Sequence, residues 1–420
     1  MLELLRGLLY DDPSQRWTLD DVQAWMDGRR LTPKQSAKRV KASRPIVVDS
    51  KKYTRPEVLA KDMWGYPDQV AKIVENSELE QWLDRAIEDK TLKLRMDQLF
   101  AEIPKYDRST GYHERLAVAV ASSLYTDCPV RYQNLSFLPS GFGKTMVEAY
   151  VQKNDMQPFI DVLRHNFIIQ CIRNRKKAAD STALIAKFDS CKAFISQSAI
   201  GTGLERCLYL MDAEAPCLSP LLEKHYVQTP EEMMAAFEDI CSKSKPQILF
   251  DRHIVAFLSV KDRKNIDPYM KDITSNEPHQ RVLGQIRTLA TIQKRSRLDK
   301  FPAITQWIAN NLEDLYERFH DSEKREEVKK QVDVIRTKGD LSKMAILFDD
   351  PKIYQSDISK FYQAMEEYRR IESEKELIEE KLKNRKNYGQ KTGRQIASVV
   401  SMALSILIIV FTAYITLLKG

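Results

Sequence analysis

The sequence has few of the residues that mark fibrous, disulfide-rich or zinc-binding proteins. Its 420 residues include only 13 glycines and 6 cysteines, and no two cysteines form a C-x-x-C pair. So little glycine excludes a collagen-like chain, and the wide cysteine spacing argues against a disulfide framework or a zinc site. We therefore expect reduced thiols that pack as small core residues in a cytosolic protein. The cysteines are Cys128, Cys171, Cys191, Cys207, Cys217 and Cys241.

Catalytic motifs are also missing from the sequence. The six histidines are scattered, and none has a second histidine four residues away that would place two metal ligands on one helical face. We find no Gly-x-Ser-x-Gly elbow and no paired carboxylates in a setting typical of a hydrolase. The sequence therefore predicts no catalytic residue, no metal site and no cofactor in this chain.

One short segment shares part of a nucleotide-binding pattern. Residues 140–145 read S-G-F-G-K-T, and G-K-T closes a P-loop. The minor candidates for phosphate binding are Gly141, Gly143, Lys144 and Thr145. A P-loop needs a further glycine where this chain has Leu138, and Pro139 removes an amide. The pattern favours a polar turn after Leu138 and a helix that starts near Thr145.

Charge is absent from one long stretch near the end of the chain. The whole sequence is polar, with 30% charged residues and a net charge of +7, yet the 23 positions 396–418 hold no charged residue. A helix of that length spans about 35 Å, which is enough to cross the hydrocarbon core of a bilayer. The N-terminus lacks the basic segment and long apolar run of a secretory signal. We predict a single-pass, tail-anchored membrane protein.

A basic run precedes this apolar stretch and predicts its orientation. It comprises Lys381, Lys383, Arg385, Lys386, Lys391 and Arg394. Only Lys419 and Gly420 follow the span, so the positive-inside rule predicts that the large N-terminal part stays cytoplasmic. Ala397, Ser401 and Ser405 recur every four residues and predict a face through which two anchors self-associate. The alternative is the ordinary abundance of small residues in membrane helices.

The remaining sequence is dominated by helical periodicity, so the predicted fold class is mainly α. Residues 54–350 are assigned to one or more helical domains, and Thr229-Pro230-Glu231-Glu232 is a capping box that starts a helix. Strand-like patterns are limited to residues 46–48, 248–250 and 255–260. A charged stalk helix is predicted over 356–384, within a segment 356–394 that includes the basic run, and its irregular apolar seam leaves coiled-coil pairing as an alternative.

A basic linker is predicted at residues 29–53. Residues 29–44 carry seven Lys or Arg and no acid. Such a stretch attracts nucleic acid or an anionic membrane surface, but it lacks the interleaved aromatic residues on which bases stack. We therefore predict protein and membrane partners and no nucleic acid.

The first 28 residues predict two short helices. Residues 4–28 read LLRGLLYDDPSQRWTLDDVQAWMDG, which predicts a helix that ends near Leu9, a turn at Asp12-Pro13, and a second helix capped by Thr18. The second helix is expected to bury Leu19, Val22 and Trp25.

This pattern resembles the end of the C-lobe of eukaryotic-like Ser/Thr protein kinases. The matching structural residues include Asp12, Pro13, Arg16 and Trp25. In that family the turn arginine, here Arg16, pairs with a buried glutamate of an upstream A-P-E segment that this chain does not contain. The Gly-rich loop, the strand lysine, H-R-D and D-F-G are also absent from the sequence.

The resemblance implies the non-catalytic C-terminal part of a membrane-anchored Ser/Thr kinase-like protein, with a regulatory or scaffolding role in signalling. It also implies kinase activity only if a catalytic domain precedes these residues. The alternative is a stand-alone tail-anchored helical adaptor that binds protein partners.

Overall fold

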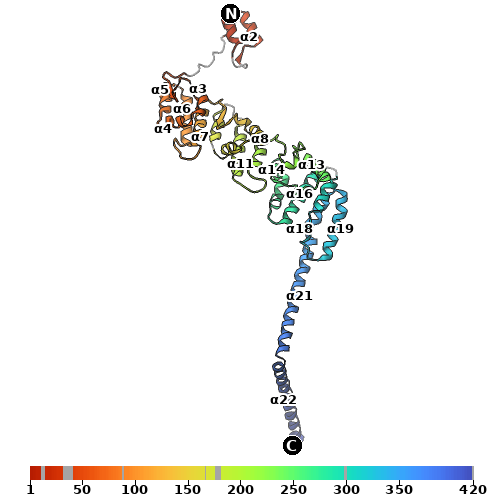
Figure 1. Cartoon of the computed structure of the whole chain (residues 1–420). Helices are drawn as coiled ribbons and strands as arrows, with labels where there is room; N and C mark the ends of the chain where they lie inside the picture. The colour runs from red at the N-terminus through yellow and green to blue at the C-terminus, as the bar shows by residue number, and fades with distance from the viewer. Residues whose placement is uncertain are drawn as a thin grey trace. The chain divides into compact units, whose positions relative to one another are not determined.

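The computed structural model describes residues 1–10, 15–31, 41–87, 89–165, 167–175, 181–297 and 300–418. About 72% of it is helical and 3% is strand, which confirms the mainly-α class (Figure 1). Contacts divide the chain into two compact units. Unit 1 is Met1–Ala236 with Gln247–Asp267, and unit 2 is Phe237–Pro246 with Pro268–Gly420.

The N-terminal pair of helices forms as expected, but its predicted buried face is wrong. Helices α1 (Leu2–Leu8) and α2 (Leu19–Met26) are present, and Thr18 and Asp21 form a complete capping box at the start of α2. Leu19 is nevertheless 88% exposed, and Val22 and Trp25 are only half-buried. No residue of α2 is buried, and the close packing in this pair of helices falls instead on Gly7, where a Cβ would meet the ring of Trp17.

The strands in the described residues form two small β-hairpins. β1 (Ile46–Val48) pairs with β2 (Lys51–Tyr53), and β3 (Val130–Tyr132) pairs with β4 (Leu135–Phe137). The strand prediction at 46–48 is therefore confirmed. The other two are wrong, since 248–250 is irregular and 255–260 lies in α14 (Arg252–Lys261). Residues 253–259 of α14 are all buried, so no exposed face interrupts the apolar run to reveal a helical period.

Helix α7 organises the N-terminal half of unit 1. The helices before it are α3 (Pro56–Asp62), α4 (Pro67–Glu75), α5 (Glu78–Ala86) and α6 (Lys90–Glu102), with a 3-10 turn at Met63–Gly65. α7 (Tyr112–Leu124) packs against α3, α4, α6 and α10 (Phe167–Arg173). Every residue from 115 to 124 is buried, and its alanines and serines allow these neighbours to approach closely.

The second half of unit 1 packs around Phe142. Its helices are α8 (Phe142–Val151), α9 (Gln157–Arg164), α11 (Ser181–Ile195), α12 (Gly203–Met211) and α14, with 3-10 turns at Pro139–Gly141 and Pro220–Leu222. The Phe142 ring lies 4.9 Å from Phe137, 5.2 Å from Phe188 and 5.7 Å from Phe159, centroid to centroid. Tilted aromatic contacts of this kind add to the energy of burial.

The helices after α12 include the predicted capping box. α13 (Pro230–Lys243) starts with Thr229 Oγ1 accepting from the Glu232 amide, while Glu232 accepts from the Thr229 amide, so that start is confirmed. α15 (Arg263–Ile273) precedes the helices of unit 2: α16 (Pro278–Ser296), α17 (Pro302–Ala309), α18 (Glu313–Tyr316), α19 (Ser322–Lys338) and α20 (Leu341–Asp349). α16 packs on α20 and α17 on α19.

Two long helices end the chain. The stalk helix α21 (Pro351–Lys383) starts five residues before its predicted position, because Pro351 occupies the first turn and Asp350 caps it. Asp357 is the one buried residue of α21. α22 (Arg385–Leu418) follows Asn384 (Figure 1).

Candidate functional site: the C-terminal helix and its basic flank

Helix α22 is long and apolar enough to span a membrane. Its 34 residues include a window of 18 with a mean hydropathy of 2.5, and none of that window is buried by the rest of the chain. No other helix in the described part of the chain meets this criterion. A fully exposed apolar helix is unfavourable in water, at about 25 cal/mol for each Å² of apolar surface. Hydrocarbon removes that cost, and the closed helical hydrogen bonds suit it.

Three hydroxyl groups of α22 are hydrogen-bonded inside the helix. Ser405 Oγ donates to the Ser401 carbonyl at 2.8 Å, and Thr412 and Thr416 donate to carbonyls one turn earlier. These bonds lower the cost of placing hydroxyls in lipid without any partner helix. The face formed by Ala397, Ser401 and Ser405 is continuous on α22, and self-association through it stays a prediction.

The basic run spans the junction between the two long helices. Lys381 and Lys383 lie in the last turn of α21, where cations favour the negative end of the helix dipole. The other four, Arg385, Lys386, Lys391 and Arg394, lie in α22 before the uncharged stretch, and all six side chains are exposed. The positive charges are therefore concentrated at the N-terminal end of the apolar segment.

The segment resembling a P-loop takes part in helix packing. α8 starts at Phe142, three residues before the predicted Thr145, because the 3-10 turn Pro139–Gly141 leads directly into it. Amides available in a P-loop are already used here: Gly141 N donates to the Leu138 carbonyl at 2.8 Å, and Phe142 N donates to the Pro139 carbonyl.

Gly143 lies against the backbone at the end of α12. A Cβ at this position would overlap the Met211 carbonyl. Lys144 forms an exposed ion pair with Glu214 at 2.9 Å, and Thr145 Oγ1 donates to the Gly141 carbonyl at 3.1 Å. Helix packing thus accounts for the glycine, the lysine and the threonine of this segment.

This packing predicts that substitutions at Gly143 and at Gly141 differ greatly in their effect on protein stability. Gly143→Val should destabilise unit 1 by about 3 kcal/mol, because overpacking a dense core costs about 1–3 kcal/mol and here the obstacle is backbone. Gly141→Ala is the matched control, since nothing lies within 4 Å of its Cβ position. Urea unfolding of the two variants measures the difference. Equal stability would contradict the packing role of Gly143.

Two of the four kinase-like residues, Arg16 and Trp25, lie in the described part of the chain. Arg16 Nε donates to the Tyr10 carbonyl at 2.7 Å, which ties a residue just before α2 back to the end of the α1 segment. Trp25 is half-buried on α2. Asp12 and Pro13 lie outside the described residues. The structure therefore places the Arg16 guanidinium in contact with the backbone of Tyr10.

A neutral histidine joins three parts of unit 1. His253 Nε2 is 2.7 Å from Tyr150 Oη and its Nδ1 is 3.1 Å from Tyr209 Oη, while Leu218 N donates to Tyr209 Oη. Burial lowers the pKa of His253, so the ring is neutral and offers one donor and one acceptor to the two hydroxyls. Burial also raises the pKa of Tyr150 and of Tyr209. This network fixes α8, α12 and α14 to one another.

An open pocket of about 650 Å³ adjoins this network, with Tyr150, Lys153, Ser219 and Tyr226 among its lining residues. Ser219 Oγ donates to Asp251 at 2.5 Å and also accepts from the Leu221 amide. Asp251 caps α14 and Ser219 caps the 3-10 turn. The Ser219–Asp251 pair therefore joins the starts of two helices, and this structural role explains the short contact between them.

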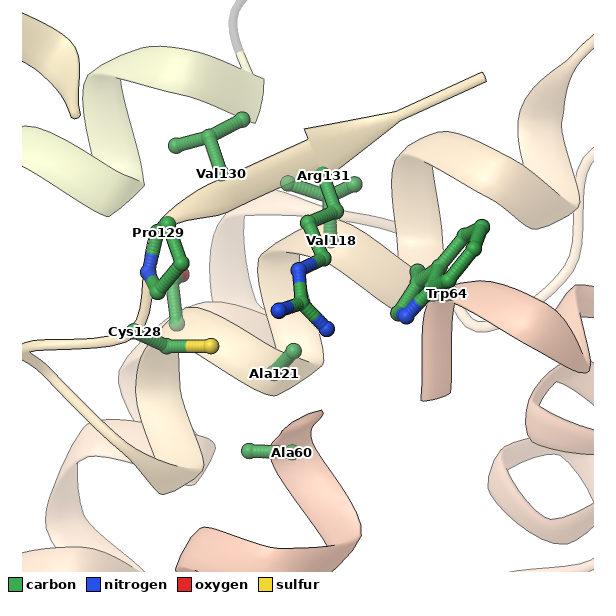
Figure 2. A pocket seen from close by; sticks show the side chains of 10 residues that line it. Ala60, Trp64, Val118, Ala121, Cys128, Pro129, Val130 and Arg131 are labelled. Carbon is green, nitrogen blue, oxygen red and sulfur yellow. The ribbon is translucent and has the colours of Figure 1, made fainter. Parts of the chain in front are cut away.

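A second hollow is too small for a substrate. Figure 2 shows it between Ala60, Trp64, Ala121, Cys128 and Arg131. Its volume is about 10 Å³, which holds about one water molecule. The Arg131 guanidinium lies 5.7 Å from the Trp64 ring and donates to the Lys61 carbonyl at 3.0 Å, so this cation already has partners.

The cysteines pack as core residues. All are free, five are buried and Cys241 is half-buried. Burial raises the pKa of Cys171 to about 11 and that of Cys217 and Cys241 to about 12, so these thiols are protonated at neutral pH and poor nucleophiles. Within the described residues, no three metal-binding side chains gather.

The sequence matches no protein-family model, no curated protein and no solved structure. Function therefore rests on the chemistry of the residues themselves. Sequence reasoning located α22 and the basic run, since both are continuous in the chain. It missed Asp357 and a basic pocket in unit 2, because the residues involved come together from distant segments and no local pattern marks them.

Proposed function

We propose that this protein is a membrane-anchored helical scaffold whose large N-terminal part lies on the cytoplasmic side. The observation that carries the proposal is the exposed apolar helix α22. A helix of this kind fixes one end of the chain in a bilayer and leaves the helical units free to bind proteins. The stalk helix α21 belongs to unit 2, spans 33 residues, or about 50 Å of helix, and carries the start of the basic run in its last turn.

The charge distribution supports the cytoplasmic orientation. Six Lys or Arg lie between positions 381 and 394, while one lysine follows the span. Cationic flanks remain on the cytoplasmic side during insertion, and anionic lipids there attract them by about 1 kcal/mol per residue. The same attraction holds the start of α22 at the membrane surface.

Glycosylation acceptor sites test the orientation. We expect an acceptor sequence appended after Gly420 to be glycosylated in microsomes, because that end reaches the lumen. The matched acceptor is placed at the exposed turn near Ser244 and should stay unmodified. The reverse pattern would overturn the orientation and leave the anchor itself intact.

Two observations support the role that we propose for the helical units. The described residues show hydrogen-bonded networks that join helices, and the segment resembling a P-loop is used in packing. We therefore propose a regulatory or scaffolding role in signalling, with protein partners bound on helical surfaces.

A more specific part of the proposal is that α1 and α2 have a kinase-like origin. Their large apolar residues Leu2, Leu5, Leu9, Leu19 and Met26 are exposed in the described chain. A group of exposed large apolar side chains indicates a surface that another part of a protein covers. We propose that α1 and α2 complete a kinase-like lobe, which makes the rest of the chain its non-catalytic, membrane-anchored extension.

Deleting residues 1–28 distinguishes this proposal from the stand-alone adaptor. The deletion should leave the melting temperature of the remaining protein unchanged within about 1 °C, because α2 contributes no buried residue. The matched variant Leu5→Ser with Leu19→Ser in the full chain should behave in the same way. A fall of several degrees in both proteins would favour the adaptor, whose helical units must then cover these leucines.

A further inference from the structure

Five cationic side chains converge on one pocket in unit 2. The pocket has a volume of about 700 Å³. Its lining residues are Gln293, Lys294, Arg297, Lys300, Lys338, Asp340, Ser342 and Lys343. They come from the end of α16, the start of α17, the end of α19 and the start of α20. Because like charges repel, this gathering of cations raises the energy of the empty pocket.

Among the described residues that line the pocket, the one acid is already paired. Asp340 lies 3.2 Å from Lys343 and also caps α20 by accepting from the Lys343 amide. Among the described residues, which omit 298 and 299 here, we find no ion pair for Lys294, Arg297, Lys300 or Lys338. These four exposed cations are therefore available to an anion from solution.

Buried hydrogen bonds hold the pocket's backbone in place. The Gly339 carbonyl accepts from Phe301 N at 3.0 Å and from Gln293 Nε2 at 3.0 Å, while Gln293 Oε1 accepts from Leu341 N at 2.9 Å. Gln293 is only 8% exposed. One amide side chain thus joins α16 to the α19–α20 turn, and the Gly339 carbonyl joins that turn to the start of α17.

Gly339 is required for this close approach. Its φ is +67°, and a Cβ would lie 2.6 Å from Phe301 N and 2.8 Å from Pro302 N. Lys338 and Lys300 are therefore brought near each other by backbone contact rather than by the reach of flexible side chains. The first turn of α20 lies at the same pocket, and the positive end of its dipole adds to the field of the cations.

We propose that this pocket binds a polyphosphorylated anion that carries at least two phosphate groups. The volume lies within the usual range for a small-molecule site. The lysines supply point charges and Arg297 supplies a planar fork that suits phosphate oxygens. Such chemistry is found in soluble inositol phosphates and in the headgroups of phosphoinositide lipids.

The test uses the full chain in nanodiscs of neutral phosphatidylcholine, so that the anchor stays in lipid. Calorimetry measures the binding of inositol hexakisphosphate, of a short-chain phosphatidylinositol bisphosphate and of inorganic phosphate. We expect both polyphosphorylated probes to bind, inorganic phosphate to bind more weakly, and affinity to fall as salt rises. The probe that binds more tightly identifies the soluble or lipid source.

Charge reversal separates this pocket from the other basic segments. Lys294→Glu with Lys338→Glu should weaken binding by at least about tenfold, because charge-assisted contacts to phosphate are replaced by repulsion. Lys271→Glu with Lys330→Glu is the matched control, since both lysines are exposed in unit 2 outside the pocket, and it should change binding less than about twofold.

Lys300→Glu alone provides a second, milder variant, and circular dichroism confirms that each protein is folded. Equal binding by the pocket variants and the control would overturn the proposal. So would the absence of polyphosphate binding by the unaltered protein. Neither result affects the membrane anchor, which is tested separately by fractionation.

Discussion

Removing residues 396–418 is expected to move this protein from the membrane fraction to the soluble fraction. The deleted segment holds no charged residue, and the helix that carries it is not covered by other parts of the chain. At about 0.3–0.6 kcal/mol for each Leu, Ile, Val or Phe at the centre of a membrane helix, the segment supplies most of the membrane affinity. We expect the basic run that remains to bind lipid headgroups only reversibly and to be released by salt.

Paired substitutions test the same prediction without shortening the chain. Leu407→Arg with Ile408→Arg places two charges near the middle of the span, each costing about 2.5–3.5 kcal/mol. The matched control is Leu377→Arg with Ile378→Arg, because these residues are exposed on the stalk helix outside the span. We expect carbonate extraction to release the first protein and not the second. Retention of both, together with retention of the deletion variant, would contradict the anchor.

Replacing Asp357 by alanine is expected to loosen the stalk helix from the preceding helices of unit 2. The carboxylate accepts hydrogen bonds from the amides of His320 at 2.9 Å and Asp321 at 3.0 Å, and it lies 3.2 Å from His320 Nδ1. His320 also stacks on Phe361 of the same helix, with ring centroids 3.9 Å apart. The loss should be about 2–4 kcal/mol, because the two part-buried amides lose their acceptor and each unsatisfied donor costs about 1–3 kcal/mol.

Hydrogen exchange of the first turns of α21 measures this loss. The matched control is Glu366→Ala, an exposed acid on the same helix, which should change stability by less than about 0.5 kcal/mol. Asp357→Asn keeps one carbonyl oxygen, so its loss of stability should lie between the losses caused by Asp357→Ala and Glu366→Ala. Unchanged protection in Asp357→Ala would show that apolar contacts alone hold the stalk.

The same carboxylate gives the stalk a pH dependence of known sign. Burial acts to raise the pKa of Asp357, but the hydrogen bonds from the two amides outweigh it, and the pKa lies below its usual value. Protonation is therefore easier in the unfolded state. The contribution is complete well above pH 4, close to the ordinary pKa of aspartate, and is lost as the pH falls through the folded pKa.

Local features of this protein were readable from the sequence wherever neighbouring residues determine them. The capping boxes at Thr18 and Thr229 place both partners within three positions, and both are present. The apolar stretch 396–418 is continuous, so its helix was predictable from composition and length. The predicted strand at 255–260 failed because α14 is buried on every side, which removes the polar face that distinguishes a helix from a strand.

The exposed residues of α1 and α2 show a related limit of prediction from the sequence. An amphipathic pattern predicts which residues seek burial, and Leu19 follows that pattern. Whether a surface covers it depends on the rest of the fold, and in the described chain none does. The G-K-T segment is the converse case, in which a familiar local motif is explained by a distant contact between Gly143 and Met211.

The sequence by itself determined that this protein is mainly helical, that its cysteines suit a core, and that its last helix is apolar enough to enter a membrane. These properties depend on composition and short-range periodicity. Only the tertiary structure brought Lys294, Lys300 and Lys338 to one pocket and buried Asp357 against His320. The physical reason is that such groups are joined by packing and hydrogen bonds between segments far apart in the chain, and their spacing in sequence carries no record of the distance between them in space.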